Sequence, residues 1–329
     1  MGTMKKITII LPVRNGGELV KECVQSILSQ TYSDFDFIIL DNHSDDGTYE
    51  WISSITDNRI KIFRSAETLS MPQNWARILD APKNEWITVI GHDDILYPGY
   101  LQVMHDLIQL NPDASLYQTH FDYININGNK VRSCLPMPAK MDDAGFLKAE
   151  FLQTMDSMGT GYMMRSKDFD MLRGFSASYP NLIFADYQLW VQLTGKSYLA
   201  ISPQTGFGYR LHQSLSITTA AENYRLAFGK YIHFLKDYMV NKPKVKQMVE
   251  EYGYVFLMYF CQSLSHRLLK SPPANRLSVK EFINECKQYA QMLGIPQPFE
   301  PAKKLKIWAA LQLDKSNWSR NLFRLIRKK

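Results

Sequence analysis

Short apolar runs alternate with amphipathic stretches over the first hundred residues of the chain. The runs are rich in β-branched residues and too short for helices, which predicts buried strands. The stretches between them repeat apolar residues at helical spacing, which predicts helices that cover a sheet. This alternation is typical of an α/β fold with a largely parallel sheet. The predicted strands are 5–13, 35–40, 59–64 and 86–90, and the predicted helices include 19–30 and 72–79.

Polar residues directly follow three of these predicted strands. Arg14 and Asn15 follow the first strand, residues 41–48 follow the second, and residues 92–94 follow the fourth. Because the carboxyl ends of parallel strands meet at one edge of a sheet, we expect these residues to form one ligand site. The glycine-rich signatures of dinucleotide dehydrogenases and of P-loop enzymes do not occur in the sequence.

The triplet His92-Asp93-Asp94 is the first candidate for chemistry. Two adjacent carboxylates repel each other unless a positive charge lies between them. Mg²⁺ and Mn²⁺ prefer oxygen ligands and keep positions open for phosphate, so a cation that carries a nucleotide diphosphate fits this pair. The residues fit a solvated surface turn equally well, and on their own they leave both interpretations open.

Asp186 is the second candidate, because it precedes an apolar stripe formed by Leu189, Trp190 and Leu193. The pattern places Asp186 at or near a helix N-terminus, where a carboxylate is a good cap. The alternative is a general base that takes the proton from an attacking hydroxyl group. Upstream, a glycine-containing segment at 159–161 either lets the backbone approach a ligand closely or simply marks the start of a strand.

Beyond Thr219 the pattern changes to helices at 224–240, 244–269, 278–293 and from 301 onward. Residues 303–329 contain nine Lys and Arg against one Asp, and they include several aromatic residues. A basic amphipathic segment of this kind is typical of a helix that lies on an anionic membrane. A solvated tail and a helix that docks on another protein fit as well. Nucleic-acid binding is not expected, because no recognition fold accompanies the basic residues.

The composition narrows the class of protein. With 329 residues, of which 45% are hydrophobic, the chain can bury a large core. No apolar run of about eighteen residues occurs, so we expect no membrane-spanning helix, and no signal-type stretch opens the sequence. The four cysteines are far apart, which favours a reducing cytoplasm over a disulfide framework or a zinc site.

An ordered series of short motifs indicates the protein family more specifically than the composition does. The series is LPVRN at 11–15, SILSQTY at 26–32, LDNHSDDGT at 40–48, NW at 74–75 and GHDD at 91–94. With it, residues 5 to about 215 resemble an inverting glycosyltransferase of family 2 with the GT-A fold. The resemblance implies an α/β, Rossmann-like nucleotide-diphospho-sugar transferase domain with a mixed, mostly parallel central sheet. The domains it predicts are a catalytic domain at 1–219, with a nucleotide-binding half at 5–125 and an acceptor-binding half at 126–219, and a helical C-terminal extension at 220–329.

The resemblance also implies roles for single residues. Asp41 would accept a hydrogen bond from the base, Asp94 and His212 would bind a Mn²⁺ or Mg²⁺ cofactor, and Asp186 would be the catalytic base. Two positions depart from the family pattern, since His92 stands where the family most often has Asp and Ala185 replaces the first residue of an acidic pair. The nucleotide-sugar-binding residues implied are Pro12, Val13, Arg14, Asn15, Asp41, Asn74, Asp93, Gly161 and Arg210.

The predicted function is metal-dependent, inverting transfer of a sugar from a nucleotide-sugar, most plausibly a UDP-sugar, to a hydroxyl group. The predicted acceptor is a bacterial cell-surface polysaccharide or a lipid-linked oligosaccharide, reached from the cytoplasm or from the cytoplasmic face of the inner membrane. Two alternatives stay open. One is a sugar-phosphate nucleotidyltransferase, and the other is a catalytically silent nucleotide-binding scaffold.

Overall fold

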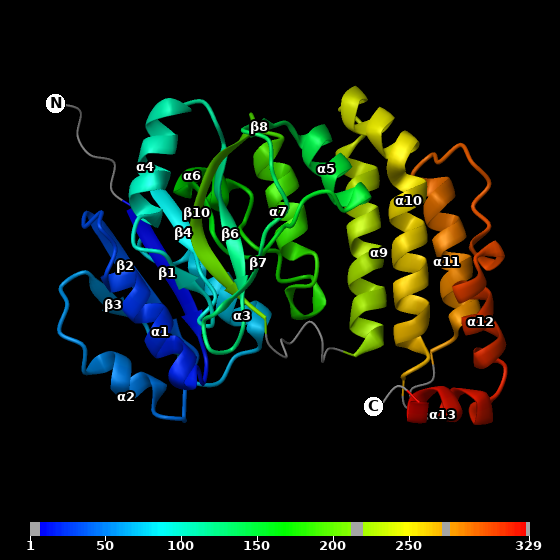
Figure 1. Cartoon of the computed structure of the whole chain (residues 1–329), viewed down its shortest axis with the longest axis horizontal. Helices are drawn as coiled ribbons and strands as arrows, with labels where there is room; N and C mark the ends of the chain where they lie inside the picture. Colours follow the sequence, from blue (N-terminus) through cyan, green and yellow to red (C-terminus); the bar gives the residue numbers. More distant parts are fainter. Residues whose placement is uncertain (1–6, 212–219, 272–276, 327–329) are drawn as a thin grey trace. The chain divides into compact units, whose positions relative to one another are not determined.

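The structure is a computed structural model that describes residues 7–211, 220–271 and 277–326. The chain divides into two compact units. Unit 1 contains residues 1–146, 155–178 and 185–214, and unit 2 contains 147–154, 179–184 and 215–329. Figure 1 shows the strands of the sheet in unit 1 and the helices α9 to α13 in unit 2.

Unit 1 is built on a mixed sheet with the strand order β3-β2-β1-β4-β9-β6-β10-β5. The pairs β3–β2, β2–β1, β1–β4 and β6–β10 are parallel, whereas β9 runs antiparallel to both of its neighbours. The sheet therefore confirms the predicted α/β fold with a mixed, mostly parallel arrangement. Its strands are β1 (Ile7–Val13), β2 (Phe35–Asp41), β3 (Ile60–Ile62), β4 (Trp86–Val89), β5 (Ile95–Leu96), β6 (Leu116–Ile124), β7 (Lys130–Ser133), β8 (Lys140–Met141), β9 (Tyr162–Arg165) and β10 (Leu199–Arg210).

The central strands are apolar because both of their faces are covered. Every residue of β1 and β4 is buried, and Ile9, Ile10 and Trp86 have no exposed surface. Such continuous burial is typical of parallel strands with helices packed on both faces of the sheet. The helices of this unit are α1 (Gly17–Leu28), α2 (Thr48–Ser53), α3 (Met71–Ala76), the 3₁₀ turn η1 (Arg77–Leu79), α4 (Tyr100–Leu110), α6 (Ser166–Met171) and α7 (Ala185–Thr194), and α5 (Asp143–Leu152) begins in it.

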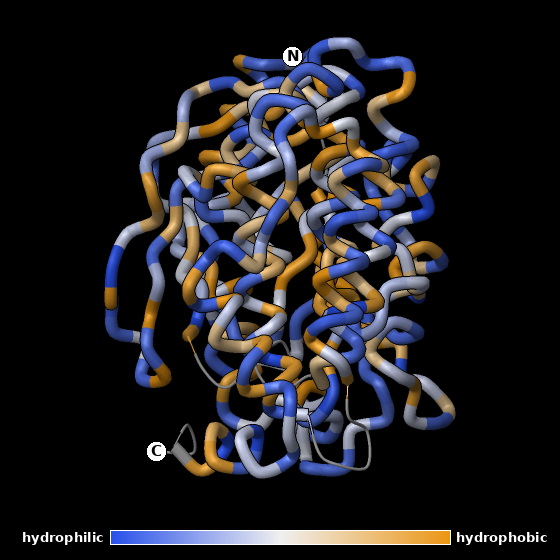
Figure 2. The backbone as a smooth tube through the Cα atoms, turned by 90° about the vertical axis from the view of Figure 1, so that its right-hand side faces the viewer, coloured by the Kyte–Doolittle hydropathy of each residue, from blue (hydrophilic) through white to orange (hydrophobic). Residues whose placement is uncertain are grey.

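Unit 2 is helical, and its core is rich in aromatic side chains. Phe228 lies at the centre of this core, with ring centroids 4.9 Å from Phe260 and 5.9 Å from Phe256. Along the helices hydrophobic and hydrophilic residues alternate, as expected for helices with one buried face (Figure 2). The helices are α9 (Ala221–Tyr238), α10 (Pro243–Leu268), α11 (Val279–Met292), α12 (Leu305–Asp314) and α13 (Asn317–Ile326), with the 3₁₀ turns η2 (Pro180–Leu182) and η4 (Pro301–Lys303).

Two features differ from the sequence-based expectation. Residues 147–154 and 179–184 belong to the helical unit, because Phe151 stacks on Phe256 at 4.2 Å and Phe184 stacks on Tyr231 at 5.2 Å. The single helix expected from residue 301 is divided into α12 and α13. The second helix starts anew because the Ser316 hydroxyl accepts a hydrogen bond from the Ser319 amide (3.1 Å).

Among the helices that the structure describes, none is both long and apolar enough to cross a membrane. All four cysteines are buried and free of disulfide bonds.

Candidate active site

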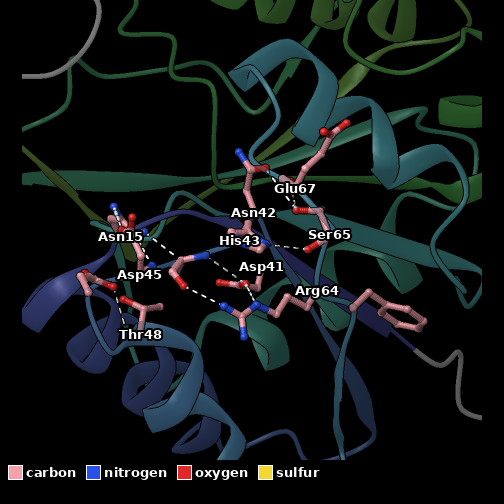
Figure 3. Close-up of polar contacts among 12 residues, drawn as sticks. Asn15, Asp41, Asn42, His43, Asp45, Thr48, Arg64, Ser65 and Glu67 are labelled. Carbon is pink, nitrogen blue, oxygen red and sulfur yellow. Dashed lines mark hydrogen bonds and ion pairs between the residues drawn. The ribbon is translucent and has the colours of Figure 1, made fainter.

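The loops that follow β1 and β2 are tied together by hydrogen bonds between their side chains and backbones (Figure 3). The Asn15 amide nitrogen Nδ2 donates to Asp45 Oδ1 (2.7 Å), and the Asp45 amide donates back to Asn15 Oδ1 (3.0 Å). The Asn15 backbone amide donates to Ser44 Oγ (3.0 Å), and the Gly16 amide donates to Thr48 Oγ1 (3.0 Å). Asn15 has a φ of 51°, a left-handed conformation that asparagine tolerates better than most residues. The two loops therefore form one preorganised structure.

Asp41 lies at the end of β2, beneath these loops, and is fully buried. Its Oδ2 accepts a hydrogen bond from the Ser44 amide (3.2 Å) and lies 3.5 Å from Arg64 Nε. Arg64 also donates to the Ser44 carbonyl (3.0 Å) and stacks over the Tyr49 ring at 4.0 Å. The other carboxylate oxygen, Asp41 Oδ1, is buried and has no hydrogen-bond partner among the residues that the structure describes. A buried acceptor without a donor is costly, and a ligand N–H group would satisfy it.

The other residues predicted around the nucleotide gather near Asp41. Pro12 and Val13 are buried at the end of β1, with Val13 paired in register with Asp41, while Arg14 is exposed. Asn74 is buried, and its Oδ1 accepts a hydrogen bond from Arg77 Nη1 (2.8 Å), which also donates to the Asp41 carbonyl (3.0 Å).

The end of β4 brings the carboxylates of Asp93 and Asp94 together. A Cβ atom placed on Gly91 would lie 2.7 Å from Asp93 Oδ1 and 3.3 Å from Asp94 Oδ2, so both carboxylates approach the same point. Burial raises the pKa of the Cys23 thiol, and the charges of Asp94 and Asp93 raise it further, whereas Arg210 lowers it. Negative charge is therefore concentrated at this strand end.

Asp94 is almost completely buried, and its oxygens are held by protein donors. The Thr160 hydroxyl donates to Oδ2 (2.8 Å), and the Arg210 backbone amide donates to Oδ1 (2.9 Å). Asp93 is only partly buried. The two carboxylates thus differ in how much of their surface is left for a ligand.

The Arg210 side chain connects distant parts of the sheet edge. It is buried, and its guanidinium donates to the carbonyls of Asp93 (2.7 Å), Asn125 (3.1 Å) and Ile126 (2.6 Å) and forms an ion pair with Glu22 (2.6 Å). In this arrangement Arg210 positions the Asp93 backbone. The predicted contact between Arg210 and a diphosphate stays a prediction, and it requires some of these bonds to be exchanged.

Asp186 lies in the first turn of α7, as predicted, and is half-buried. Its Oδ1 accepts a hydrogen bond from the Tyr187 amide (3.0 Å), and among the described residues no cation is paired with it. Burial raises the pKa of the Asp186 carboxyl to about 6, against a smaller opposing effect of the Tyr187 amide. A carboxylate with a pKa near neutrality is well suited to accept a proton in a reaction.

The backbone around Asp186 is specialised for this position. Phe184, two residues earlier, has a φ of 67°, which is unfavourable for a bulky side chain and is typical of functional segments. Facing the carboxylate, the position of a Cβ on Gly159 is 3.4 Å from Asp186 Oδ2. The Trp190 Nε1 group donates to the Met158 carbonyl (3.0 Å) and so ties α7 to the glycine-containing segment.

Gly161 has a structural reason to be glycine. It has a φ of 77°, and a Cβ there would lie 2.4 Å from the Phe207 ring. Its predicted contact with the sugar stays a prediction. Gly159, which the sequence reasoning did not assign, is the glycine that borders Asp186.

Other residues of the site gave no local signal in the sequence. Arg64, Ser44 and Thr160 contact the predicted carboxylates; Arg64 comes from a segment that no motif includes, and Ser44 and Thr160 lie in segments that were singled out without a role for these two residues. His212, the second predicted metal ligand, lies outside the described residues. Within those residues no group of three or more His, Cys, Asp or Glu side chains could hold a metal ion.

Comparison of the chain with known proteins finds similar glycosyltransferases. The sequence model described as "Glycosyl transferase family 2" matches residues 8–172, which is half of the chain. The glycosyltransferase GlyG of Streptococcus pneumoniae is 26% identical over 37% of this chain and 42% of its own length. The UDP-Glc:α-D-GlcNAc-diphosphoundecaprenol β-1,3-glucosyltransferase WfgD of Escherichia coli is 25% identical over 63% of this chain and 78% of its own length.

Solved structures show the same fold. TarS of S. aureus in complex with UDP-GlcNAc superposes with a TM-score of 0.66 at 13% identity, covering 98% of this chain and 92% of that one. The mannosyltransferase PcManGT of Pyrobaculum calidifontis in complex with GDP-Man and Mn²⁺ gives a TM-score of 0.54 at 12% identity, covering 100% and 89% of the two chains.

The chain spans less than half the length of the first curated relatives that it matches, at 42% and 46%. The fold nevertheless confirms the predicted GT-A architecture, and the family match confirms the predicted enzyme class at the level of the family. The chain belongs to glycosyl transferase family 2, as its motifs predicted.

Proposed function

We propose that the chain transfers a sugar from a nucleotide-sugar, with UDP as the expected nucleotide, to a hydroxyl group with inversion at the anomeric carbon. The observation that carries the proposal is Asp186, a half-buried carboxylate with a pKa near 6 beside a glycine. The acceptor is expected to be a glycan or a lipid-linked oligosaccharide, because WfgD is named for a diphosphoundecaprenol-linked acceptor. The cytoplasmic location stays a prediction.

The donor is expected to bind at the Asp41 loops. The unpartnered Asp41 Oδ1 supports recognition of a base that presents an N–H group, as uracil does. The hydrogen bonds of Asn15 with Ser44 and Asp45 hold the loops in place before the donor arrives, which reduces the entropy lost on binding.

A single displacement accounts for the chemistry with the residues present. Asp186 accepts the proton of the acceptor hydroxyl while its oxygen forms a bond to the anomeric carbon and the bond to the nucleotide diphosphate breaks. The attack comes from the face opposite the leaving diphosphate, so the configuration inverts. The neighbouring Gly159 leaves room beside the carboxylate, where a larger side chain would contact Asp186 Oδ2.

The residues at the end of β4 fit a divalent cation as a partial ligand set. Asp93 and Asp94 are hard oxygen donors that approach one point in a negatively charged region, and Mg²⁺ or Mn²⁺ commonly uses one or two carboxylates together with substrate phosphates. Asp93 and Asp94 would hold the cation, with His212 as a further candidate from sequence. When bound, the cation supplies positive charge that stabilises the departing diphosphate.

The test is a turnover assay with a panel of nucleotide-sugars, with and without Mn²⁺ or Mg²⁺, that follows release of nucleoside diphosphate. We expect metal-dependent hydrolysis of a UDP-sugar, and faster release when a lipid-linked acceptor is added. A scaffold protein would bind the donor without turnover. A nucleotidyltransferase would instead release pyrophosphate from a nucleoside triphosphate and a sugar phosphate.

Comparing Asp93→Asn with Asp94→Asn tests which of the two carboxylates binds the cation. Loss of Mn²⁺-dependent UDP affinity in a variant that circular dichroism shows to be folded identifies a ligand. A lower melting temperature is expected for Asp94→Asn in addition, because its carboxylate accepts bonds from Thr160 and Arg210 in the interior. Full metal-dependent turnover in both variants would exclude a metal site at this strand end.

A further inference from the structure

Helix α13 exposes three apolar side chains and buries a charged one, the opposite of what a surface helix normally does. Trp318, Leu322 and Leu325 lie at helical spacing i, i+4 and i+7 and are 74%, 42% and 67% exposed. We call these three residues the α13 stripe. By contrast, Arg320 on the same helix is buried, with 4% exposure. A helix on a water-exposed surface normally buries its apolar stripe and exposes its charges.

Buried contacts fix this orientation. Arg320 Nη1 lies 3.3 Å from Asp314 Oδ1, and Arg320 Nη2 donates to the Leu268 carbonyl at the end of α10. Asp314 is buried as well and accepts a hydrogen bond from the Val279 amide (2.8 Å) at the start of α11. Turning α13 to bury the stripe would break this ion pair and leave a buried carboxylate without its cation, which is costly. The stripe is therefore held outward.

The stripe lies in the most basic part of the chain. Residues 315–329 contain six Lys and Arg and no Asp or Glu. Arg320 is paired internally with Asp314, so it contributes no charge to an external partner. Lys315 is exposed and Arg324 is half-buried beside the stripe. An outward apolar stripe with a tryptophan, flanked by uncompensated positive charge, matches the chemistry of an anionic bilayer surface.

We propose that the α13 stripe is a docking surface for an anionic lipid bilayer. Trp318, Leu322 and Leu325 enter the interface between head groups and acyl chains, and the surrounding Lys and Arg residues bind the anionic head groups. The alternative occupant, a second copy of this chain, is less favoured by charge, because two copies would bring the same basic segments together. The proposal goes beyond the transfer reaction and does not depend on the identity of the donor.

The experiment measures binding of the full chain to phosphatidylcholine vesicles that contain about one third phosphatidylglycerol, and to vesicles of phosphatidylcholine alone. The test variant is Trp318→Ser/Leu322→Ser/Leu325→Ser, which removes the stripe and keeps every charge. The matched control is Leu110→Ser/Met171→Ser/Val240→Ser, which removes three other apolar side chains that are 79%, 67% and 69% exposed. Circular dichroism and melting temperature show whether each variant is folded.

We expect the stripe variant to bind anionic vesicles about ten-fold more weakly or worse, since three buried apolar side chains are lost from the membrane-bound state. The control is expected to bind like the wild type. Binding of the wild type should weaken on vesicles without anionic lipid and at high salt, because head-group attraction is screened.

Each contrary result overturns the proposal. The wild type could fail to bind vesicles, the stripe variant could bind anionic vesicles as tightly as the wild type, or the wild type could bind neutral and anionic vesicles equally. A wild-type dimer in light scattering that the stripe variant dissociates would assign the stripe to a second copy instead. Donor hydrolysis without vesicles is measured in parallel, so a failure of the glycosyltransferase assignment is recognised separately.

Discussion

The loops around Asp41 and the segment around Asp186 place a carboxylate in two opposite settings within unit 1. Asp41 lies beside the Arg64 cation and accepts a bond from the Ser44 amide, within loops that are joined by several further hydrogen bonds. Asp186 has the Tyr187 amide and no paired cation among the residues described, and burial raises its pKa to about 6. The first setting suits recognition of a ligand N–H group, and the second suits transfer of a proton.

The difference between Asp41 and Asp186 shows that burial alone does not identify a catalytic acid or base. Asp41 is the more buried of the two, yet its surroundings supply positive charge. What distinguishes Asp186 is desolvation without a compensating cation in the described part of the chain. Variants at the two positions should therefore have different kinetic effects.

The largest expected effect is that of Asp186→Asn. The amide cannot accept the acceptor proton, so transfer should fall by about a hundred-fold or more, while donor affinity stays near the wild-type value. The Asn side-chain oxygen can still accept the Tyr187 amide hydrogen bond, so the first turn of α7 should remain capped. Steady-state kinetics and calorimetric UDP binding measure the two quantities.

The matched control is Glu222→Gln, which removes an exposed carboxylate from the first turn of α9. It should leave transfer unchanged. If Asp186→Asn retains most of the transfer rate, Asp186 is only a helix cap and the contrast with Asp41 disappears. If it loses donor affinity in parallel with rate, Asp186 belongs to the donor site.

Asp41→Ala should have the next largest effect, and on binding. A hydrogen bond to a charged acceptor contributes about 1.5–3 kcal/mol, so UDP affinity should fall roughly ten- to hundred-fold. Binding of a sugar phosphate without a base should not change. Equal weakening of the two ligands would mean that Asp41 supports the loops through Ser44 and does not contact the base.

The pH dependence sharpens the contrast further. With a pKa of about 6, Asp186 is protonated in acid, so kcat should fall about ten-fold for each pH unit below that value. UDP affinity should not follow this profile. A profile of kcat that is flat down to pH 5 would contradict the assignment of Asp186 as the base.

The raised pKa of Asp186 also makes the free energy of unfolding depend on pH. Because the pKa of Asp186 is raised above its ordinary value of 3.8, its contribution to stability is present below about pH 4 and is lost as pH rises through about 6. Asp186→Asn does not titrate, so relative to the wild type it should gain on the order of 1–3 kcal/mol between pH 4 and pH 8. Urea unfolding at the two pH values measures this difference.

The sequence predicted the features of the site that depend on local pattern. Strands β1, β2 and β4 and the first turn of α7 lie where periodicity placed them, because apolar runs and caps are read from neighbouring residues. The short strands β5 and β8 were not predicted, since two residues carry no periodicity. The antiparallel placement of β9 depends on contacts across the sheet and has no local signal.

The same limit applies to the residues that tune the site. Arg64 reaches Asp41 from 23 residues away in sequence, and Thr160 and the Arg210 backbone amide reach Asp94 from 66 and 116 residues away. The outward stripe of α13 was not predictable from periodicity either. The pattern of apolar residues marks the stripe, but only the buried Arg320–Asp314 pair decides which side of the helix faces solvent.

The smallest expected effect concerns Asn15, and it distinguishes a direct nucleotide contact from a positioning role. The structure shows both side-chain ends of Asn15 bonded to Asp45. If Asn15 acts only by joining the two loops, Asn15→Gly and Asp45→Ala should each weaken UDP binding about two- to ten-fold, the range of one ordinary hydrogen bond. Glycine is chosen because the φ of 51° strains alanine but not glycine, so Asn15→Ala should be weaker still. The double variant Asn15→Gly/Asp45→Ala should bind like Asn15→Gly alone, because Asn15→Gly removes both bonds, whereas Asp45→Ala removes only the bond to its carboxylate and keeps the one from its backbone amide. Additive losses in this cycle would show that Asn15 contacts the nucleotide itself, as the family resemblance implies.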